Sequence, residues 1–421
     1  MFQKTSLQNG LRVLTQRMDG TNSVTVLILA GAGSRYETKE QNGISHFLEH
    51  MFFKGAKKYV NTKAVSEAID AVGGDFNAFT GKEYAGYYVK VASEHIELAM
   101  DVLSDMLLHA RFDAHEIDKE RGVILEEFNM YQDTPMYQVG WDFERLLFGD
   151  QPLGWDQVGS KELIRSVTQN DFVKYKKALY TADNTIVSIV GKIDNRASVS
   201  LVEQYFDFNN DKKSSIWKPY QPYVSENRVH LTHKKTEQGH IVVGFYGYPE
   251  THKDHYALKV LSVLLGGNMS SRMFLNVREA KGLAYYIQTS TDDYADVGVI
   301  STRAGVDVNR CEEAVRAIVE EYRHAVTSDI PANEVKKAKD YLKGKLVLRL
   351  EDSEEYAHLL GKYELLHDMV KMPKEIIRGI EKVEVFDVIR VAKDLFKQEN
   401  LRLATIGPFE DRAKFESSLD F

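Results

Sequence analysis

The chain has 421 residues, 43% of them hydrophobic and 28% charged, and carries a net charge of −8 at pH 7. This length predicts about two to four domains, and the acidic balance argues against a nucleic-acid partner because no basic excess can neutralise phosphates. No stretch approaches the ~18 apolar residues of a membrane span. Cys311 is the only cysteine, which excludes an intramolecular disulfide. The N-terminus resembles no targeting segment, so we expect a cytoplasmic protein or a mature form whose leader was removed.

Hydrophobic periodicity predicts the elements of the first half. In chain order they are strands at 11–14 and 23–30, a glycine-rich and charged loop at 31–43, helices at 44–53 and 62–72, an aromatic strand pair within 75–91, helices at 93–109 and 114–131, and a strand at 184–190.

A polar segment with two prolines follows and is the best linker candidate, at 213–228. Beyond it the order of elements repeats, with strands at 230–232 and 240–245, a helix at 255–265, strands at 284–291 and 297–304, a helix at 310–325 and a strand at 401–406. We therefore predict an α+β fold of two homologous domains, 1–212 and 229–421. Each is expected to hold a mixed or antiparallel sheet with helices packed on one face.

The strongest chemical signal is the pentad from His46 to His50. On a helix, His46, Glu49 and His50 fall within one arc of about 100°, and apolar side chains occupy the other side. Two imidazoles one turn apart can hold zinc, with the carboxylate acting on the metal-bound water, and the order H-x-x-E-H is that of the inverted zincins. The alternative is a solvated polar face that happens to carry two histidines.

A catalytic zinc needs a third protein ligand, and the helix predicted at 114–131 offers candidates. Glu127 lies near the edge of its apolar stripe, and Glu120, seven residues earlier, lies on nearly the same line. Glu126 points to solvent. Glu127 is therefore the better ligand, and Glu120 is a candidate for orienting a histidine, although an ordinary surface acid fits Glu120 almost as well.

The segment HFLEHMFFKG (46–55), with Gly-Ser-Arg at 33–35 and VILEEF at 123–128, resembles the pitrilysin superfamily of zinc peptidases. The likeness is greatest to the mitochondrial processing peptidase β-subunit and its bacterial relatives, and it covers essentially the whole chain. It implies one zinc per chain on His46, His50 and Glu127, with Glu49 as catalytic base and Glu120 as supporting residue.

The prediction of substrate contacts rests mainly on the family resemblance. The stretch 73–80 reads as a turn into an exposed strand, which could bind an extended peptide or be an ordinary hairpin. The resemblance implies that Asn77 and Ala78 take the substrate backbone, and that Arg278 and Tyr285 act on the substrate carbonyl. Without it, Arg278 would be a surface charge and Tyr285 a strand residue packing on the sheet.

Two domains are half of the four-domain chamber of pitrilysin, so the resemblance implies a homodimer in which Arg278 and Tyr285 act across the dimer. We expect a zinc metalloendopeptidase that hydrolyses peptides or unfolded precursor segments. The alternatives are a non-catalytic assembly subunit such as the core subunits of respiratory complex III, an enzyme that needs a separate partner chain, and, remotely, another metal hydrolase.

Overall fold

A computed structural model describes residues 2–208, 211–223 and 225–421, in which the chain divides into two compact units. Unit 1 comprises Met1–Phe128, Trp155–Lys218 and Val347–Met372, and unit 2 comprises Asn129–Gly154, Pro219–Leu346 and Pro373–Phe421. Residue 224 of the predicted linker, and residues 209 and 210 just before it, lie outside the described residues.

Unit 1 is built on a six-stranded mixed sheet in the order β1-β2-β6-β3-β5-β4. Its strands are β1 (Gln3–Ser6), β2 (Arg12–Arg17), β3 (Ser23–Ala30), β4 (Asp75–Thr80), β5 (Ala85–Ala92) and β6 (Thr185–Gly191). β2 and β6 pair in parallel, whereas the other neighbours are antiparallel. β4 pairs only with β5, so it forms one edge of this sheet among the described residues.

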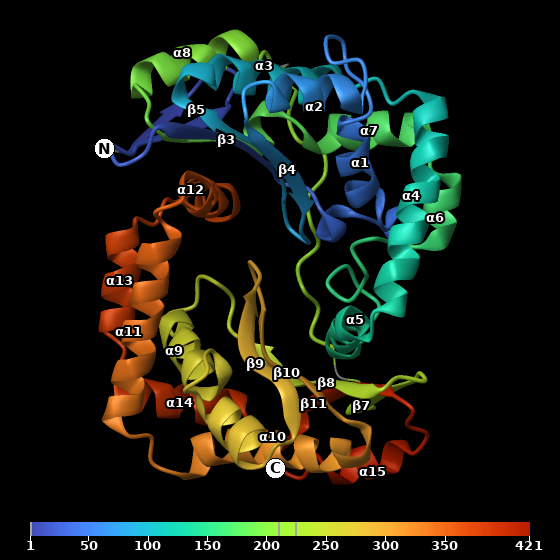
Figure 1. Cartoon of the computed structure of the whole chain (residues 1–421), viewed down its shortest axis with the longest axis vertical. Helices are drawn as coiled ribbons and strands as arrows, with labels where there is room; N and C mark the ends of the chain where they lie inside the picture. Colours follow the sequence, from blue (N-terminus) through green and yellow to red (C-terminus); the bar gives the residue numbers. More distant parts are fainter. Residues whose placement is uncertain (1, 209–210, 224) are drawn as a thin grey trace. The chain divides into compact units, whose positions relative to one another are not determined.

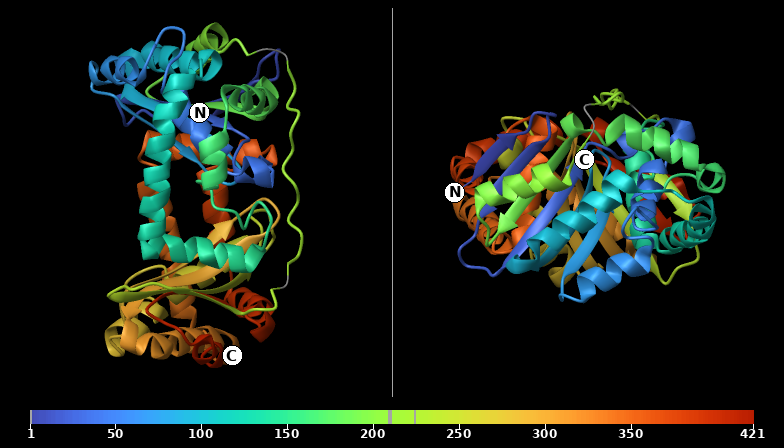
Figure 2. Two further views of the ribbon diagram at one scale, coloured as in Figure 1. Left: turned by 90° about the vertical axis from the view of Figure 1, so that its right-hand side faces the viewer. Right: turned by 90° about the horizontal axis from the view of Figure 1, so that it is seen from above.

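The helices of unit 1 lie on both faces of its sheet (Figure 1). They are α1 (Ile44–Phe52), α2 (Thr62–Asp70), α3 (Ile96–His109), α4 (Ala114–Asp133, with its last residues in unit 2), α6 (Lys161–Ser166), α7 (Gln169–Leu179), α8 (Asn195–Tyr205) and α12 (Ser353–His367). Seen from above, α8, α3 and α2 extend across one face (Figure 2, right). Helix α12 packs against β6 and β3 on the opposite face.

The burial of β3 follows from this double cover. Leu27 and Leu29 pack with Ala357 and Leu360 of α12, and alternate residues of a strand point to opposite faces. Every residue from Val24 to Ala30 is therefore buried. Helices on one face were predicted, and the structure adds a helix from the second half of the chain on the other.

Unit 2 holds a five-stranded sheet in the order β7-β11-β8-β10-β9, in which β7 and β11 pair in parallel and the other neighbours are antiparallel. Its strands are β7 (Val229–His233), β8 (Gln238–Gly247), β9 (Ala284–Asp293), β10 (Gly298–Asp307) and β11 (Arg402–Gly407). Its helices are α5 (Pro135–Phe148), α9 (His255–Gly266), the π-helical segment Met273–Ala280, α10 (Cys311–Thr327), α11 (Ala332–Arg349, with its last residues in unit 1), α13 (Pro373–Glu381), α14 (Val385–Leu395) and α15 (Arg412–Ser417).

Helix α5 mirrors α12, because it comes from the first half of the chain and packs on the second sheet. Val139, Phe143 and Leu147 of α5 share a buried cluster with Val242 of β8 and Ile406 of β11. The predicted α+β fold with two sheets is confirmed. The predicted boundaries at 1–212 and 229–421 follow sequence order and stay a prediction, whereas compactness assigns α5 and α12 the other way round.

Within the part of the chain that the structure describes, no helix is both long and apolar enough to cross a membrane.

Candidate metal centre

Helix α1, which carries the pentad, is anchored at its start by a buried carboxylate. Gly43 precedes the helix with φ of 104°, and a side chain there would meet the carbonyl oxygen of Val158. Glu37, only 4% exposed, accepts hydrogen bonds from the backbone N–H groups of Gly43 (2.8 Å) and Ser45 (2.9 Å) and from the Ser45 hydroxyl (2.6 Å). Burial raises the pKa of Glu37, and these hydrogen bonds oppose that shift. The carboxylate thus caps the helix N-terminus from a distance.

The two faces of α1 differ as the spacing predicts. The side chains that pack into the core, each at most 1% exposed, are Ile44, Phe47, Leu48, Met51 and Phe52. The imidazoles of His46 and His50 are 12% and 21% exposed, and their ring centroids lie 4.8 Å apart. Packing of the apolar face therefore fixes both imidazoles on the other side of the helix.

Helix α4 brings Glu127 to these two histidines. Glu127 Oε1 lies 3.6 Å from His46 Nε2, and Glu127 Oε2 lies 3.5 Å from His50 Nε2. One ligand atom from each of the three residues falls within 4.8 Å of the others. The structure thus brings together the three side chains that the sequence analysis selected.

The donor set and its spacing fit zinc. Two imidazole nitrogens and a carboxylate oxygen at ~2.0–2.1 Å from a tetrahedral zinc would lie about 3.3 Å apart, close to the distances of 3.6 and 3.5 Å between the Glu127 oxygens and the two imidazoles. Three protein ligands leave one position for water or substrate, which is the arrangement of catalytic rather than structural zinc sites.

Glu120, two helical turns before Glu127 on α4, contacts the His50 ring. Its Oε1 lies 2.9 Å from His50 Nδ1, and its Oε2 lies 2.6 Å from Lys54 Nζ. Nδ1–H of His50 can donate to this carboxylate, which leaves the lone pair of Nε2 directed at Glu127. Glu120 thus lies where an orienting residue is needed. Lys54, which sequence reasoning did not select, holds it there.

The charges around His50 affect its protonation. Burial alone would lower the pKa of His50, but the hydrogen bond with Glu120 and the charges of Glu127 and Glu49 outweigh it and raise the pKa. The same contacts with His50 and Lys54 lower the pKa of Glu120 against the effect of burial. Metal binding requires neutral imidazole, so a zinc ion would compete with a proton for the His50 ring.

Glu49 is held by Thr80, a residue that sequence reasoning did not select. The Thr80 hydroxyl, at the end of β4, donates to Glu49 Oε2. This contact joins the pentad helix to the edge strand of the sheet. A threonine ending a predicted strand gives no signal of such a role, because its partner depends on how α1 packs against β4.

The sequence is similar to that of known zinc proteases. Residues 12–147 match the family model described as insulinase (peptidase family M16), and residues 166–342 match the model described as the peptidase M16 inactive domain. An uncharacterized zinc protease of Bacillus subtilis is 37% identical over 409 residues, which cover 97% of this chain and 98% of that protein. The chain belongs to peptidase family M16. The resemblance to the pitrilysin superfamily is thereby confirmed.

Solved structures share the fold of this M16 chain. A protease from Helicobacter pylori superimposes with a TM-score of 0.90 at 24% identity, covering 97% of this chain and 99% of that one. A chain of complex III from Candida albicans gives 0.86 at 17% identity, with full coverage of both chains. The fold alone therefore occurs both in a protease and in a chain of complex III.

The predicted substrate strand of the M16 chain is the edge strand β4. Asn77 is exposed, and its side-chain oxygen accepts from the backbone N–H of Ala78 (2.9 Å). This bond occupies a donor that an added strand would need, which is one way to protect an edge. A peptide binding here would have to displace the Asn77 side chain.

Arg278 and Tyr285 both belong to unit 2. Arg278 lies in the last turn of the π-helical segment, an irregularity frequent at functional sites, and its guanidinium lies over the ring of Phe274 at 4.6 Å. Tyr285 is 63% exposed at the start of β9. Without the family resemblance, Tyr285 was expected to pack on the sheet, and its high exposure does not fit that expectation. The catalytic roles of both residues stay predictions.

Proposed function

We propose that this M16 chain is a zinc-dependent metalloendopeptidase with one zinc ion per chain, held by His46, His50 and Glu127. The observation that carries the proposal is the convergence of these three ligand atoms within 4.8 Å on the helix face that also bears Glu49. When bound, zinc supplies a Lewis acid that polarises the scissile carbonyl and makes water a stronger acid.

The residues of the chain supply the proton transfers. Glu49 accepts a proton from the attacking water and later gives it to the leaving amine. The hydroxyl of Thr80 holds the Glu49 carboxylate in one orientation. Tyr285, exposed and able to donate from its phenol, stabilises the oxyanion, and Arg278 adds positive charge there.

Substrates are peptides or unfolded precursor segments that add a strand beside β4. Backbone pairing does not depend on side chains, so it accepts many sequences. Thr80 links this edge to Glu49, so a strand added along β4 would pass the catalytic carboxylate.

The active form is a homodimer in which Arg278 and Tyr285 of one copy serve the zinc of the other. The support for this part is the resemblance to four-domain peptidases and the presence of both residues in the same chain as the zinc ligands. A second candidate function is a non-catalytic assembly subunit, and the likeness to a complex III chain favours it. The intact ligand set and Glu49 favour the peptidase.

The deciding experiment measures cleavage of quenched fluorescent peptides together with bound zinc. The wild type should cleave with about one zinc per chain, Glu49→Gln should keep zinc and lose at least a thousandfold in rate, and Glu126→Gln, on the exposed face of α4, should match the wild type. Zinc binding without cleavage of any peptide would favour the assembly role.

Mixing two inactive variants tests the dimer. If Tyr285 acts across the dimer, a Glu49→Gln and Tyr285→Phe mixture contains heterodimers with one intact site. Half of the dimers with one of two sites intact would restore about a quarter of the wild-type rate after subunit exchange. A mixture that stays inactive under exchange would show that Tyr285 does not act in this way.

A further inference from the structure

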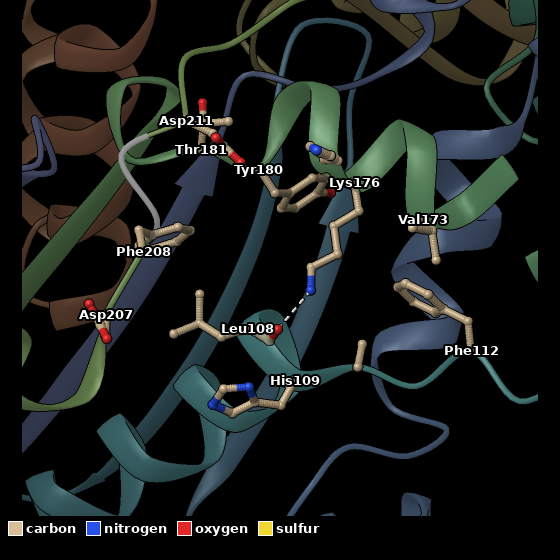
Figure 3. Close-up of a pocket in the computed structure, with 12 residues that line it drawn as sticks. Leu108, His109, Phe112, Val173, Lys176, Tyr180, Thr181, Asp207, Phe208 and Asp211 are labelled. Atoms are coloured by element: carbon tan, nitrogen blue, oxygen red, sulfur yellow. Dashed lines mark hydrogen bonds between the residues drawn. The ribbon is translucent and has the colours of Figure 1, made fainter. Parts of the chain in front are cut away.

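A pocket of about 490 Å³ lies in unit 1, away from the zinc ligands, where the end of α3 meets α7 (Figure 3). Its volume lies within the range of small-molecule sites, about 300–1,000 Å³. Three aromatic side chains, Phe112, Tyr180 and Phe208, line it and are each at most 8% exposed. The pocket therefore combines aromatic walls with polar groups in a volume of ligand size.

One cationic side chain enters this pocket. Lys176 runs from α7 towards the end of α3, with Phe208 on one side and Phe112 on the other (Figure 3). Its ammonium donates to the carbonyl oxygen of Leu108 at 2.9 Å. Among the described residues it forms no ion pair, so an ammonium with three donors has only this one protein acceptor.

The other charged groups of the pocket are exposed at its mouth. They are His109, Lys177, Asp207 and Asp211. Two of them are carboxylates and one is an ammonium, and water and salt screen their charges at these exposed positions. Lys176 differs, because burial alone lowers its pKa to about 8 and no carboxylate offsets that burial. Lys176 is half-buried, and a half-buried cation without a counter-ion loses part of its hydration, a cost that a ligand carboxylate would relieve.

A structural role accounts for only part of this arrangement. A lysine at the end of a helix commonly binds the last carbonyl groups, and the Leu108 bond at the end of α3 fits that role. The role does not explain the aromatic pocket around the stem or the remaining donors. We propose that the pocket binds a small monocarboxylate with an aromatic body, whose carboxylate pairs with Lys176 and whose ring packs against Phe112, Tyr180 and Phe208.

The site is separate from the zinc face of α1. The rings of Phe112 and Tyr180 contact Phe52, at centroid distances of 5.9 and 5.2 Å. Phe52 is fully buried on the face of α1 opposite the histidines. A ligand in the pocket therefore lies behind the zinc helix, and its carboxylate binds no metal.

Binding of 3-phenylpropionate to the full chain, followed by NMR with ¹³C-labelled lysine, tests the proposal. Lys176→Met should weaken the Kd at least tenfold. Lys174→Met, the same change at an exposed position of α7, should leave the Kd unchanged. The neutral analogue 3-phenylpropanamide should bind the wild type at least tenfold more weakly than the acid. Equal affinity of the acid for wild type and Lys176→Met, or equal affinity of acid and amide, would overturn the proposal.

A second readout needs no variant. A bound carboxylate stabilises the charged ammonium, so saturating acid should raise the pKa of Lys176 in the wild type, and the amide should not. An unchanged Lys176 titration, or a Kd weaker than about 10 mM, would overturn the proposal even if Lys176→Met failed to fold.

Discussion

Removing Glu120 should weaken zinc binding although Glu120 is not a ligand. Its carboxylate is 4% exposed and lies 2.9 Å from His50 Nδ1 and 2.6 Å from Lys54 Nζ. Glu120→Ala would leave the His50 ring without its acceptor and Lys54 without its partner. The ring could then rotate, and Nε2 would no longer be held towards Glu127.

The size of the effect can be worked out in two ways. A hydrogen bond to a charged group contributes ~1.5–3 kcal/mol. Loss of a residue that orients a metal ligand typically costs 10–100-fold in affinity, which is about 1.4–2.7 kcal/mol. Both give a zinc Kd raised roughly 10–100-fold. Glu120→Gln keeps an oxygen that can accept from His50 but loses the charge facing Lys54, so a smaller increase is expected.

Competition with a chromophoric zinc chelator at fixed pH measures these constants directly. Glu126→Ala is the matched control, because Glu126 lies on the same helix, next to the ligand, with an exposed side chain. A Kd for Glu120→Ala within twofold of the control would refute the reasoning and make Glu120 a residue of structural importance only. Circular dichroism of the metal-free proteins distinguishes loss of the fold from loss of the hydrogen bond between Glu120 and His50.

Other parts of the molecule give further predictions. Thr80→Val should lower kcat roughly tenfold with zinc content unchanged, because it removes the hydroxyl that donates to Glu49. Thr80→Ser keeps a hydroxyl and should retain the wild-type rate. A wild-type kcat for Thr80→Val would contradict the positioning role of Thr80. Gly122→Ala should stabilise α4 by about 0.5–1 kcal/mol in urea unfolding, because its Cβ would meet nothing within 4 Å, and a loss of stability would contradict that. Hydrogen bonds from Arg390 lower the pKa of Asp254 below its usual 3.8, so this pair stabilises the fold above that value and loses its effect as pH falls through the lowered pKa. Asp254→Asn should therefore unfold more easily than wild type at pH 6, by about 1 kcal/mol, and this difference in unfolding free energy should shrink as the pH falls below 3.8. A difference that does not shrink over that range would exclude the linkage.

The sequence could predict the parts of the site that depend on local geometry. Helical spacing places His46, Glu49 and His50 on one side of α1 whatever surrounds the helix, and the structure has that arrangement. Glu127 and Glu120 share one line of α4 for the same reason. That α4 would approach α1 at all came from the family resemblance, because helical periodicity says nothing about which helices meet.

Contacts between distant segments could not be predicted in this way. Thr80 contacts Glu49 only because β4 runs beside α1, and Glu37 caps α1 from within a loop that has no regular pattern. Helix α12 was not predicted, and neither was its place on the first sheet. Its packing partners in β3 lie more than 300 residues earlier, which is beyond the reach of any local pattern.

Helices α5 and α12 each pack on the sheet formed by the other half of the chain, and this affects what happens when the chain is divided between the halves. Separation within 211–228 would yield an N-terminal piece that lacks α12 and carries α5, whose own sheet is in the other piece. The first sheet of that piece would expose the apolar row that α12 covers, including Leu27, Leu29 and Ile186. The zinc-bearing half expressed alone would then aggregate. A nick at the same place in the intact protein should instead leave both pieces associated, held by the helix that each provides to the other's sheet.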